Sequence, residues 1–331
     1  MTVNKKEMLT SDYLREISDK AIGTITSSPE CERLYAPVRY ILSLSGKRLR
    51  PVMCLLSCNL FSDKIDDAVM PAVGIEVFHN FTLVHDDIID KAEIRRGSPT
   101  VHANWGVGQA LLSGDVMAFI ASDCIGQTPD RVLAKVLRLF NRTAIEVCLG
   151  QQLDIDFEKK SVVSEAEYIR MIELKTAVLI AASLKIGAVI GGAGEKDQDL
   201  LYAFGRSLGI AFQIQDDILD TYGDTKMFGK KTGGDIISNK KTYLLVKALE
   251  LAGGESLRDL RSLLETKEFD PVRKVEAVKA IYDTLQIQLH AENLAYEYIN
   301  SAFESLDKVS VTPDRKNELK QLAVGLIGRE R

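Results

Sequence analysis

The segment FTLVHDDIID at residues 81–90 places an aspartate-rich run directly after an apolar stretch. A second segment, FQIQDDILD at residues 212–220, repeats the D-D-x-x-D pattern, with Asp86 and Asp216 standing 130 residues apart. In an α-helix the first and last aspartates of such a run lie about 40° apart on one face, where like charges repel. The apolar neighbours argue against a solvated acidic surface. Because hard divalent cations take oxygen ligands, the repeated pattern predicts a metal site on inward-facing helices.

The rest of the chain favours helices over strands. Its 331 residues are 46% hydrophobic and 27% charged, which is ordinary for a globular protein. Prolines are absent between residues 130 and 270, no sustained alternation of polar and apolar residues appears, and Ser164-Glu165-Ala166-Glu167 forms a capping box. We therefore expect an all-α fold, in which residues 1–331 form a single large helical bundle domain around a deep central cavity.

Charge and apolar patterning exclude several classes of protein. A net charge of −5 gives no general attraction to nucleic acid. The N-terminal MTVNKKEMLTSDYL has no apolar signal core, and Lys185 and three glycines interrupt the most apolar stretch, residues 176–193. Five cysteines without zinc spacing fit reduced thiols in the core. We expect a cytoplasmic protein that binds no nucleic acid and is not integral to a membrane.

Basic residues gather near both aspartate runs. The motif Gly46-Lys47-Arg48-Leu49-Arg50-Pro51 precedes an apolar run, and Arg95-Arg96-Gly97 closely follows Asp90. After the second run, residues 223–241 interleave glycines with lysines, a composition typical of a mobile loop that binds phosphate. Single lysines and arginines are usually ordinary surface residues. Their place just downstream of each aspartate run predicts metal ions held between carboxylates and a di- or triphosphate.

With these motifs the chain resembles the trans-polyprenyl diphosphate synthases, which include the farnesyl and geranylgeranyl diphosphate synthases. The matching motifs follow the family's order from residue 46 to residue 242, so the resemblance covers nearly the whole chain. They are GKRLRP at 46–51, His79, the first aspartate motif with Arg95-Arg96-Gly97, GQQLD at 150–154, Lys175-Thr176, Phe212-Gln213 before the second motif, Gly229-Lys230, and Lys240. The resemblance implies an isoprenoid synthase-like fold and a prenyltransferase.

The resemblance also implies two diphosphate pockets and the residues that form them. Three Mg²⁺ ions would be held on the diphosphate of an allylic substrate (dimethylallyl, geranyl or farnesyl) by Asp86, Asp90, Asp216 and Asp220. The same diphosphate would contact Arg95, Lys175, Thr176, Gln213, Lys230 and Lys240. Isopentenyl diphosphate would be bound without metal by Lys47, Arg50, His79 and Arg96. Among these, the catalytic residues would be Asp86, Asp90, Asp216, Lys175, Thr176 and Gln213.

The spacing of His79 agrees independently with two neighbouring pockets. His79 precedes Asp86 by seven residues, or two helical turns, which is about 10.5 Å along the axis on nearly the same face. The alternative is a core histidine bonded to a carbonyl.

The implied reaction explains the need for such a site. Breaking the allylic carbon–oxygen bond gives a delocalised carbocation and free diphosphate, whose growing charge Mg²⁺ stabilises as a Lewis acid. The double bond of isopentenyl diphosphate then attacks the cation, and the released diphosphate is the acceptor that we expect for the lost proton. Water would capture the cation, which is a reason for a glycine- and lysine-rich lid to close.

Product length in the family depends on bulky residues beneath the first motif. Phe81 and Thr82 stand five and four residues before Asp86, roughly 6–7.5 Å down the helix axis. If these two residues form the floor of the tail pocket, a floor with one aromatic residue predicts a short product but not the shortest. We expect geranylgeranyl diphosphate (C20), with farnesyl diphosphate (C15) as the next candidate. Residues of the next helix could move this floor, and Phe81 could equally be ordinary core.

Two other functions share the aspartate chemistry. A class I terpene cyclase also binds Mg²⁺ through an aspartate-rich motif, but its second metal site typically carries Asn, Ser/Thr and Glu, where this chain repeats Asp. A non-catalytic subunit of a heteromeric prenyl synthase normally has eroded motifs, whereas both are intact here. Because family members are usually homodimers, we expect a homodimer. The preferred allylic substrate and the downstream pathway do not follow from the residues.

Overall fold

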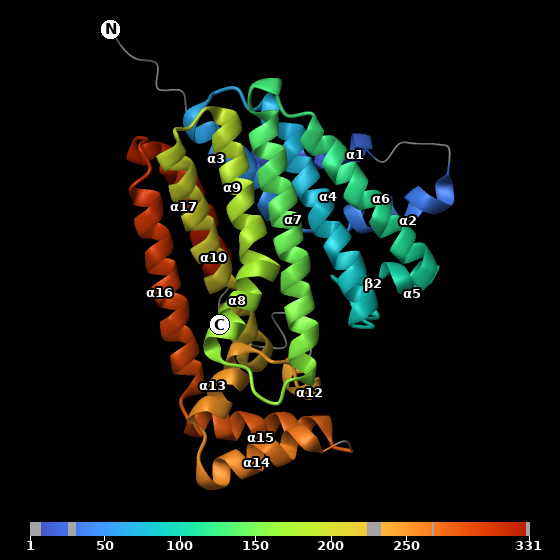
Figure 1. The fold of residues 1–331 in the computed structure, drawn as a ribbon, viewed down its shortest axis with the longest axis vertical. Helices are drawn as coiled ribbons and strands as arrows, with labels where there is room; N and C mark the ends of the chain where they lie inside the picture. Colours follow the sequence, from blue (N-terminus) through green and yellow to red (C-terminus); the bar gives the residue numbers. More distant parts are fainter. Residues whose placement is uncertain (1–7, 26–30, 224–232, 267, 329–331) are drawn as a thin grey trace. The chain divides into compact units, whose positions relative to one another are not determined.

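The computed structural model describes residues 8–25, 31–223, 233–266 and 268–328. These residues are almost entirely helical, which confirms the all-α prediction (Figure 1). The chain divides into two compact units, and four of the five breaks between them fall inside helices. These are α7 (Asp130–Lys159), α9 (Val178–Gly191), α10 (Glu195–Tyr222) and α17 (Pro313–Ile327). That the whole chain is a single domain stays a prediction.

The first unit comprises Met1–Arg142, Ala182–Tyr202 and Lys308–Lys320. Its own helices are α1 (Ser11–Ile25), α2 (Glu32–Ser43), α3 (Leu49–Phe61), α4 (Asp66–Ile89), α5 (Val101–Trp105) and α6 (Val107–Gly126). Helix α4 packs closely along α6, which requires small residues between them. A Cβ atom on Gly74 would lie 2.8 Å from the Ala121 carbonyl oxygen. This packing fixes the helix that ends in the first aspartate motif.

A short hairpin follows α4 and carries two of the predicted site arginines. Strand β1 (Ile94–Arg95) pairs antiparallel with β2 (Ser98–Pro99), so that Ile94 faces Pro99. The turn residues Arg96 and Gly97 have φ angles of 52° and 76°, and positive φ at both central residues is characteristic of tight two-residue hairpin turns. Two-residue strands give no alternating pattern, which explains why the sequence did not predict them.

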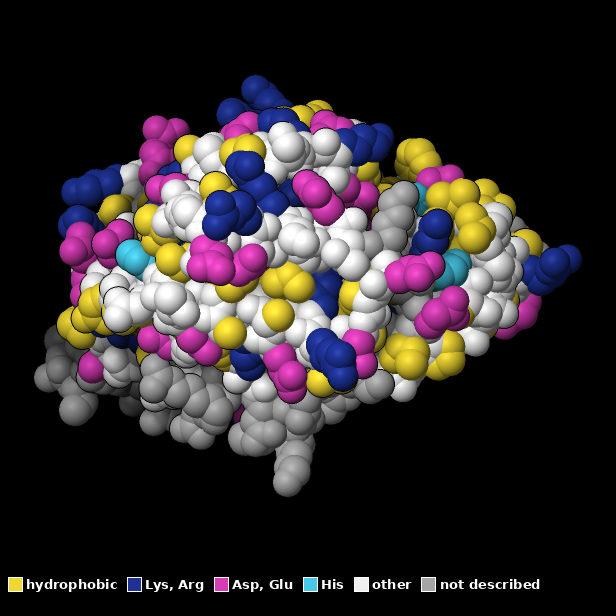
Figure 2. All heavy atoms as spheres, turned by 90° about the horizontal axis from the view of Figure 1, so that it is seen from below, with side chains coloured by type: hydrophobic (Ala, Val, Ile, Leu, Met, Phe, Trp, Pro, Cys, Tyr) yellow, Lys and Arg dark blue, Asp and Glu magenta, His cyan; other side chains and the backbone are white. Residues whose placement is uncertain are grey.

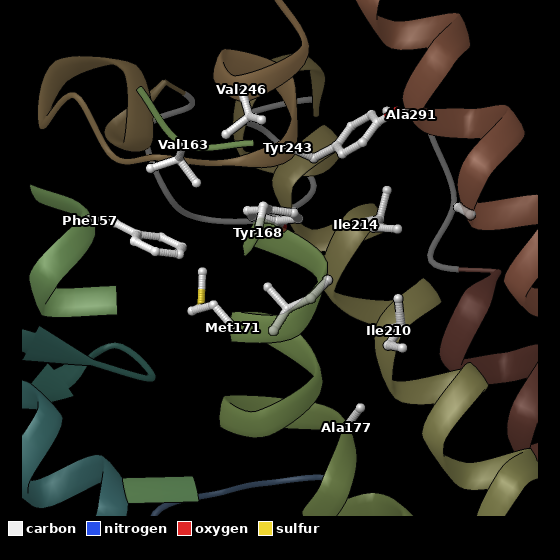
Figure 3. Packing of buried hydrophobic residues seen from close by; sticks show 12 residues of the cluster. Phe157, Val163, Tyr168, Met171, Ala177, Ile210, Ile214, Tyr243, Val246 and Ala291 are labelled. Carbon is white, nitrogen blue, oxygen red and sulfur yellow. The ribbon is translucent and has the colours of Figure 1, made fainter. Parts of the chain in front are cut away.

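The second unit comprises Thr143–Ala181, Ala203–Asp307 and Gln321–Arg331. Its own elements are α8 (Glu165–Ile172), the π-helix η1 (Glu173–Ala177), α12 (Gly234–Ile237), α13 (Tyr243–Leu251), α14 (Gly254–Glu265), α15 (Pro271–Thr284) and α16 (Ile287–Asp307). The predicted capping box opens α8, where Ser164 Oγ accepts the Glu167 N–H and the Glu167 carboxylate accepts the Ser164 N–H. A buried cluster that includes Phe157, Tyr168 and Tyr243 forms part of the core (Figure 3).

One helical stretch is long and apolar enough to cross a membrane by length and composition. It runs from Glu165 to Gly191 with a mean hydropathy of 1.7 in its most apolar window, and 78% of that window is buried inside the protein, as in a core helix. On the face drawn in Figure 2, basic and acidic side chains are interspersed, and no large patch of either sign appears among the described residues there.

The five cysteines are free, but only some of them lie in the core. Cys54, Cys58 and Cys124 are buried, as predicted, whereas Cys31 and Cys148 are exposed, so the core assignment was wrong for these two. Helix α9 approaches α3 so closely that a Cβ on Gly187 would lie 1.9 Å from the Cys54 carbonyl oxygen. Glycine at position 187 of α9 therefore allows this close helix packing.

Candidate active site

The first aspartate motif lies at the C-terminal end of α4. Asp86 is partly buried in the last turn, and Asp90 is the exposed C-cap residue, whose N–H donates to the Asp86 carbonyl at 2.8 Å. Asp87, between them, is fully buried. The motif therefore has two carboxylates accessible to solvent and one that belongs to the interior.

The buried Asp87 is bound by Arg95 from the hairpin. The Arg95 Nε lies 2.8 Å from both carboxylate oxygens, and a terminal guanidinium nitrogen lies 2.7 Å from one of them. A carboxylate in the interior needs such a partner because an unpaired buried charge is strongly destabilising. The contact of Arg95 with an allylic diphosphate stays a prediction, and the structure adds the Asp87 partner that the motif alone did not reveal.

Three of the four residues predicted to bind isopentenyl diphosphate form a basic group in the first unit: Arg50, His79 and Arg96. The Arg50 Nε and one terminal nitrogen of Arg96 are buried with no hydrogen-bond partner in the described part of the chain. Burial lowers the pKa of Arg50 to about 10. Burial, followed by the charges of Arg50 and Arg96, lowers the pKa of His79 well below 6.5, so its imidazole is neutral at pH 7. Unpaired buried donors are costly, which makes this group suited to an anionic ligand.

The loop before α3 shapes the edge of this basic group. A Cβ on Gly46 would lie 3.1 Å from a terminal nitrogen of Arg96, so glycine leaves room for the guanidinium. Lys47, the fourth predicted residue, is exposed on the same loop. Arg48 has a left-handed conformation (φ 45°) and is buried.

Arg48 serves the fold, although it lies between two predicted ligand-binding residues. Its guanidinium donates to Asp19 at 2.8 Å, to Glu76 at 3.1 Å and to the Leu42 carbonyl at 2.5 Å. Glu76, 3% exposed, also accepts from Asn80 at 3.1 Å. The negative charge of the buried Glu76 partly opposes the lowering of the Arg50 pKa by burial. The signal for Glu76 in the sequence was a lone acidic residue inside an apolar helix.

Aromatic rings lie under the first motif on α4. The Phe81 ring is 5.4 Å from Phe78 and 4.8 Å from His85, and Phe78 also contacts Phe140 at 5.4 Å. The Thr82 hydroxyl donates to the His79 carbonyl at 2.8 Å, so it is occupied by its own helix. Phe81 is therefore part of a larger aromatic group, and whether this group limits product length stays a prediction.

The second motif ends α10 and repeats the arrangement of the first. Asp216 and Asp220 are partly buried, while Asp217 is 5% exposed. The Asp217 carboxylate accepts hydrogen bonds from the Tyr168 hydroxyl at 2.5 Å, the Tyr243 N–H at 2.9 Å and the Gln213 amide at 3.2 Å. Burial raises the pKa of Asp217 to about 7, against the opposing effect of the Tyr168 hydrogen bond.

Asp220 holds the start of α12. Its carbonyl accepts the Gly233 N–H at 2.6 Å and its carboxylate accepts the Asp235 N–H at 2.9 Å. Burial raises the pKa of Asp235 to about 6; Lys240 opposes this, and the charges of Asp220, Asp154 and Asp216 add to it. Lys240 Nζ lies 3.9 Å from the Asp235 carboxylate. Asp235 was not predicted, and Lys230 lies outside the described residues.

The π-helix η1 presents the Lys175-Thr176 pair. Lys175 Nζ lies 2.6 Å from the Asp154 carboxylate, and the Thr176 hydroxyl donates to the Gln213 carbonyl oxygen at 3.1 Å. A Cβ on Gly150 would lie 2.3 Å from the Lys175 backbone nitrogen, so α7 can contact η1 only through glycine. Single-turn π-helices are often found at functional sites.

The donor set of the second motif suits Mg²⁺. The charges of Asp216 and Asp220 add to the burial that raises the pKa of Asp235, so these carboxylates lie close together, and oxygen ligands are those that Mg²⁺ prefers. Within the described residues no group of three or more His, Cys, Asp or Glu side chains is arranged to hold a metal ion by itself. Substrate phosphates and water commonly complete a Mg²⁺ shell, so two carboxylates from a motif are compatible with binding.

Comparison with known proteins agrees with these motifs. The polyprenyl synthetase family model matches residues 31–285. The chain belongs to the polyprenyl synthetase family. It is a trans-prenyltransferase, specifically a short-chain trans-prenyl diphosphate synthase, which confirms the predicted family and enzyme class.

Relatives cover nearly the whole length of this synthase. Geranylgeranyl diphosphate synthase of Methanosarcina mazei is 36% identical over 94% of both chains. Geranylfarnesyl diphosphate synthase of Natronomonas pharaonis is 35% identical over 93% of this chain and 92% of its own. A crystal structure of a geranylgeranyl pyrophosphate synthase has a TM-score of 0.93 at 39% identity, covering 98% of this chain and all of the other. The synthase therefore has the all-α fold of the isoprenyl synthases.

Proposed function

We propose that this synthase catalyses the Mg²⁺-dependent head-to-tail (1′–4) condensation of isopentenyl diphosphate with an allylic diphosphate. The observation that carries this proposal is the basic group of Arg50, His79 and Arg96, in which two buried guanidinium nitrogens have no acceptor within the part of the chain that the structure describes. A metal-free diphosphate supplies enough acceptor oxygens for them, and arginine recognises such groups in bidentate geometry. Lys47 would add a further positive charge from the neighbouring loop.

The aspartate motifs would bind the metal. Asp86 and Asp90 in one unit and Asp216 and Asp220 in the other would hold Mg²⁺, and we expect three ions with substrate bound. Bound Mg²⁺ would supply Lewis-acid stabilisation of the charge that grows on the allylic diphosphate as it leaves. The joint action of both motifs is part of the proposal.

The remaining residues of the second unit would position the allylic diphosphate. Lys175, Lys230 and Lys240 would contact its oxygens, as would Arg95 from the first unit. Thr176 and Gln213, which are bonded to each other, would orient their dipoles toward the reacting carbon without acting as nucleophiles. The departing diphosphate would accept the proton lost after carbon–carbon bond formation, so the proposal needs no protein base.

For the product we propose geranylgeranyl diphosphate (C20), with farnesyl diphosphate (C15) as the competing length. The aromatic group of Phe78, Phe81 and Phe140 would form the floor of the tail pocket. The names of the relatives given above support C20 and also admit a longer C25 product. We further propose a cytoplasmic homodimer.

A single assay tests the proposal. Purified protein, Mg²⁺ and isopentenyl diphosphate are incubated with dimethylallyl, geranyl or farnesyl diphosphate in turn, and the products are separated by chain length. We expect elongation to C20, loss of activity in EDTA and recovery when Mg²⁺ is restored. A cyclic hydrocarbon product would identify the protein as a terpene cyclase and refute the proposal. Turnover only after a second chain is added would identify a subunit of a heteromeric enzyme.

A further inference from the structure

The middle aspartate of the second motif is engaged by the protein itself. Asp217 is buried, and its two carboxylate oxygens accept three hydrogen bonds, from Tyr168, Tyr243 and Gln213. A carboxylate has about four lone-pair sites, so this arrangement uses most of them. Asp217 therefore needs a role other than that of the accessible Asp216 and Asp220.

That role is visible in the orientation of Gln213. Its amide nitrogen donates to Asp217 at 3.2 Å, which leaves its carbonyl oxygen to accept the Thr176 hydroxyl at 3.1 Å. A side-chain amide carries its N–H donors on the nitrogen and its acceptor on the oxygen. Once the nitrogen is bonded to a carboxylate, the oxygen is the atom that faces the other neighbour. Asp217 thus determines that Thr176 is a hydrogen-bond donor to Gln213.

Tyr168 is the side chain that holds Asp217 from α8. It is 1% exposed and its ring lies in the buried cluster with Met171, Ile214 and Tyr243 (Figure 3). Its hydroxyl is the side-chain link from α8 to the carboxylate on α10. Tyr168 stands five residues before η1 begins at Glu173, so it connects the helix that leads to Lys175 and Thr176 with the helix that carries Asp216.

We propose that Tyr168 is a positioning residue for the transfer reaction. Through Asp217 it orients Gln213 and Thr176 and fixes the end of α10 next to Asp216. The inference rests on the proposed function, because it assigns Gln213, Thr176 and Asp216 to the allylic diphosphate. It adds a residue that lies in neither aspartate motif and is too deeply buried to contact substrate.

Tyr168→Phe tests this inference, because it removes the hydroxyl and retains the ring. We expect kcat to fall at least about tenfold, the size expected for a lost buried hydrogen bond to a charged group. The KM for isopentenyl diphosphate should stay within about threefold, because its proposed ligands belong to the first unit. The control is Tyr298→Phe, which removes a hydroxyl from a partly buried tyrosine packed against the same cluster and should change kcat by less than about twofold.

Coupling to Thr176 separates positioning from general stability. If Tyr168 acts through Gln213 and Thr176, Tyr168→Phe should reduce kcat by a much smaller factor in a Thr176→Val background than in the parent enzyme. The inference would be overturned if the kcat losses of the two substitutions simply multiplied in the double variant, or if Tyr168→Phe and Tyr298→Phe lost kcat equally.

A second measurement needs no turnover. Inorganic diphosphate with Mg²⁺ should raise the Tm of the parent enzyme, and Tyr168→Phe should retain less than about half of that rise, while Tyr298→Phe retains all of it. Equal rises in both variants contradict the inference even if the parent elongates isopentenyl diphosphate. If the parent enzyme does not elongate isopentenyl diphosphate, the proposed function is refuted. The Tm comparison still decides the role of Tyr168 in that case.

Discussion

At the scale of single residues, burial gives ordinary side chains their special properties. Arg50 and Arg96 each bury one guanidinium nitrogen that has no acceptor among the described residues, and His79 is a histidine kept neutral by burial and by their charges. Glu76 partly offsets this positive charge and is itself held by Arg48. The basic group is thus arranged before any ligand arrives, which reduces the cost of ordering it on binding.

Arg50→Gln should weaken the binding of isopentenyl diphosphate. We expect its KM to rise at least about tenfold, because a charge-assisted hydrogen bond contributes about 1.5–3 kcal/mol. The KM for the allylic diphosphate should change by less than about threefold. Arg33→Gln, at an exposed position of α2, is the control and should leave both values unchanged. Equal increases for the two substrates would remove Arg50 from the isopentenyl diphosphate pocket.

His79 should make stability depend on pH in a defined direction. In the unfolded chain it titrates near 6.5, whereas in the folded protein its pKa is well below that value. Between the two values only the unfolded chain binds the proton, so folding stability is present above about pH 6.5 and is lost as the pH falls below it. In urea unfolding at pH 5 to 7.5, His79→Asn should lose less stability on acidification than the parent, and the exposed-site control His290→Asn should behave like the parent. Parallel curves for all three proteins would contradict this.

At the scale of elements, helix ends and helix contacts place the functional groups. Both aspartate motifs end long helices, α4 and α10, and in both the middle aspartate is bound inside the protein while the outer two stay accessible. The π-helix η1 directs Lys175 to Asp154 and Thr176 to Gln213. Glycine at position 150 allows α7 to reach the backbone of η1, which explains the glycine of the GQQLD motif.

Helix α4 also provides the test of product length. Phe81→Ala removes one ring of the aromatic group and should shift the product distribution toward longer chains, measured by chromatography of the dephosphorylated alcohols. Phe303→Ala is the matched control, since it removes a ring that packs on Phe204 in the second unit and should leave the distribution unchanged. An unchanged product from Phe81→Ala would place the floor elsewhere, with Phe78 and Phe140 the next positions to vary.

At the scale of the whole molecule, the proposed reaction needs contributions from both units. The basic group and the first aspartate motif belong to one unit, and the second motif with Lys175 and Thr176 belongs to the other. The outer aspartates of both motifs are partly buried or exposed and lie outside the buried cores, so we expect their replacement to leave the helical fold intact. Activity and folding can therefore be separated by mutation.

Asp86→Ala and Asp216→Ala should each reduce turnover by at least about a thousandfold, because loss of a metal ligand removes charge stabilisation at the leaving diphosphate. Circular dichroism should show parent-like helix content in both variants. Asp259→Ala, an exposed position of α14, should retain full activity. Substantial activity in either motif variant would refute the metal assignment for that motif.

The sequence alone determined the helical class and the position of both aspartate motifs, because local periodicity and short spacing are converted by a helix directly into a shared face. The residues of the basic group were expected from the family resemblance, and their role as ligands of isopentenyl diphosphate stays a prediction. Tertiary structure decided the partners of the buried charges. Arg48 with Glu76 and Tyr168 with Asp217 are 28 and 49 residues apart in the chain, so only packing brings them together. Sequence periodicity identifies which side of a helix is buried, whereas the hydrogen bonds of a buried polar group depend on which neighbouring helix supplies the donor.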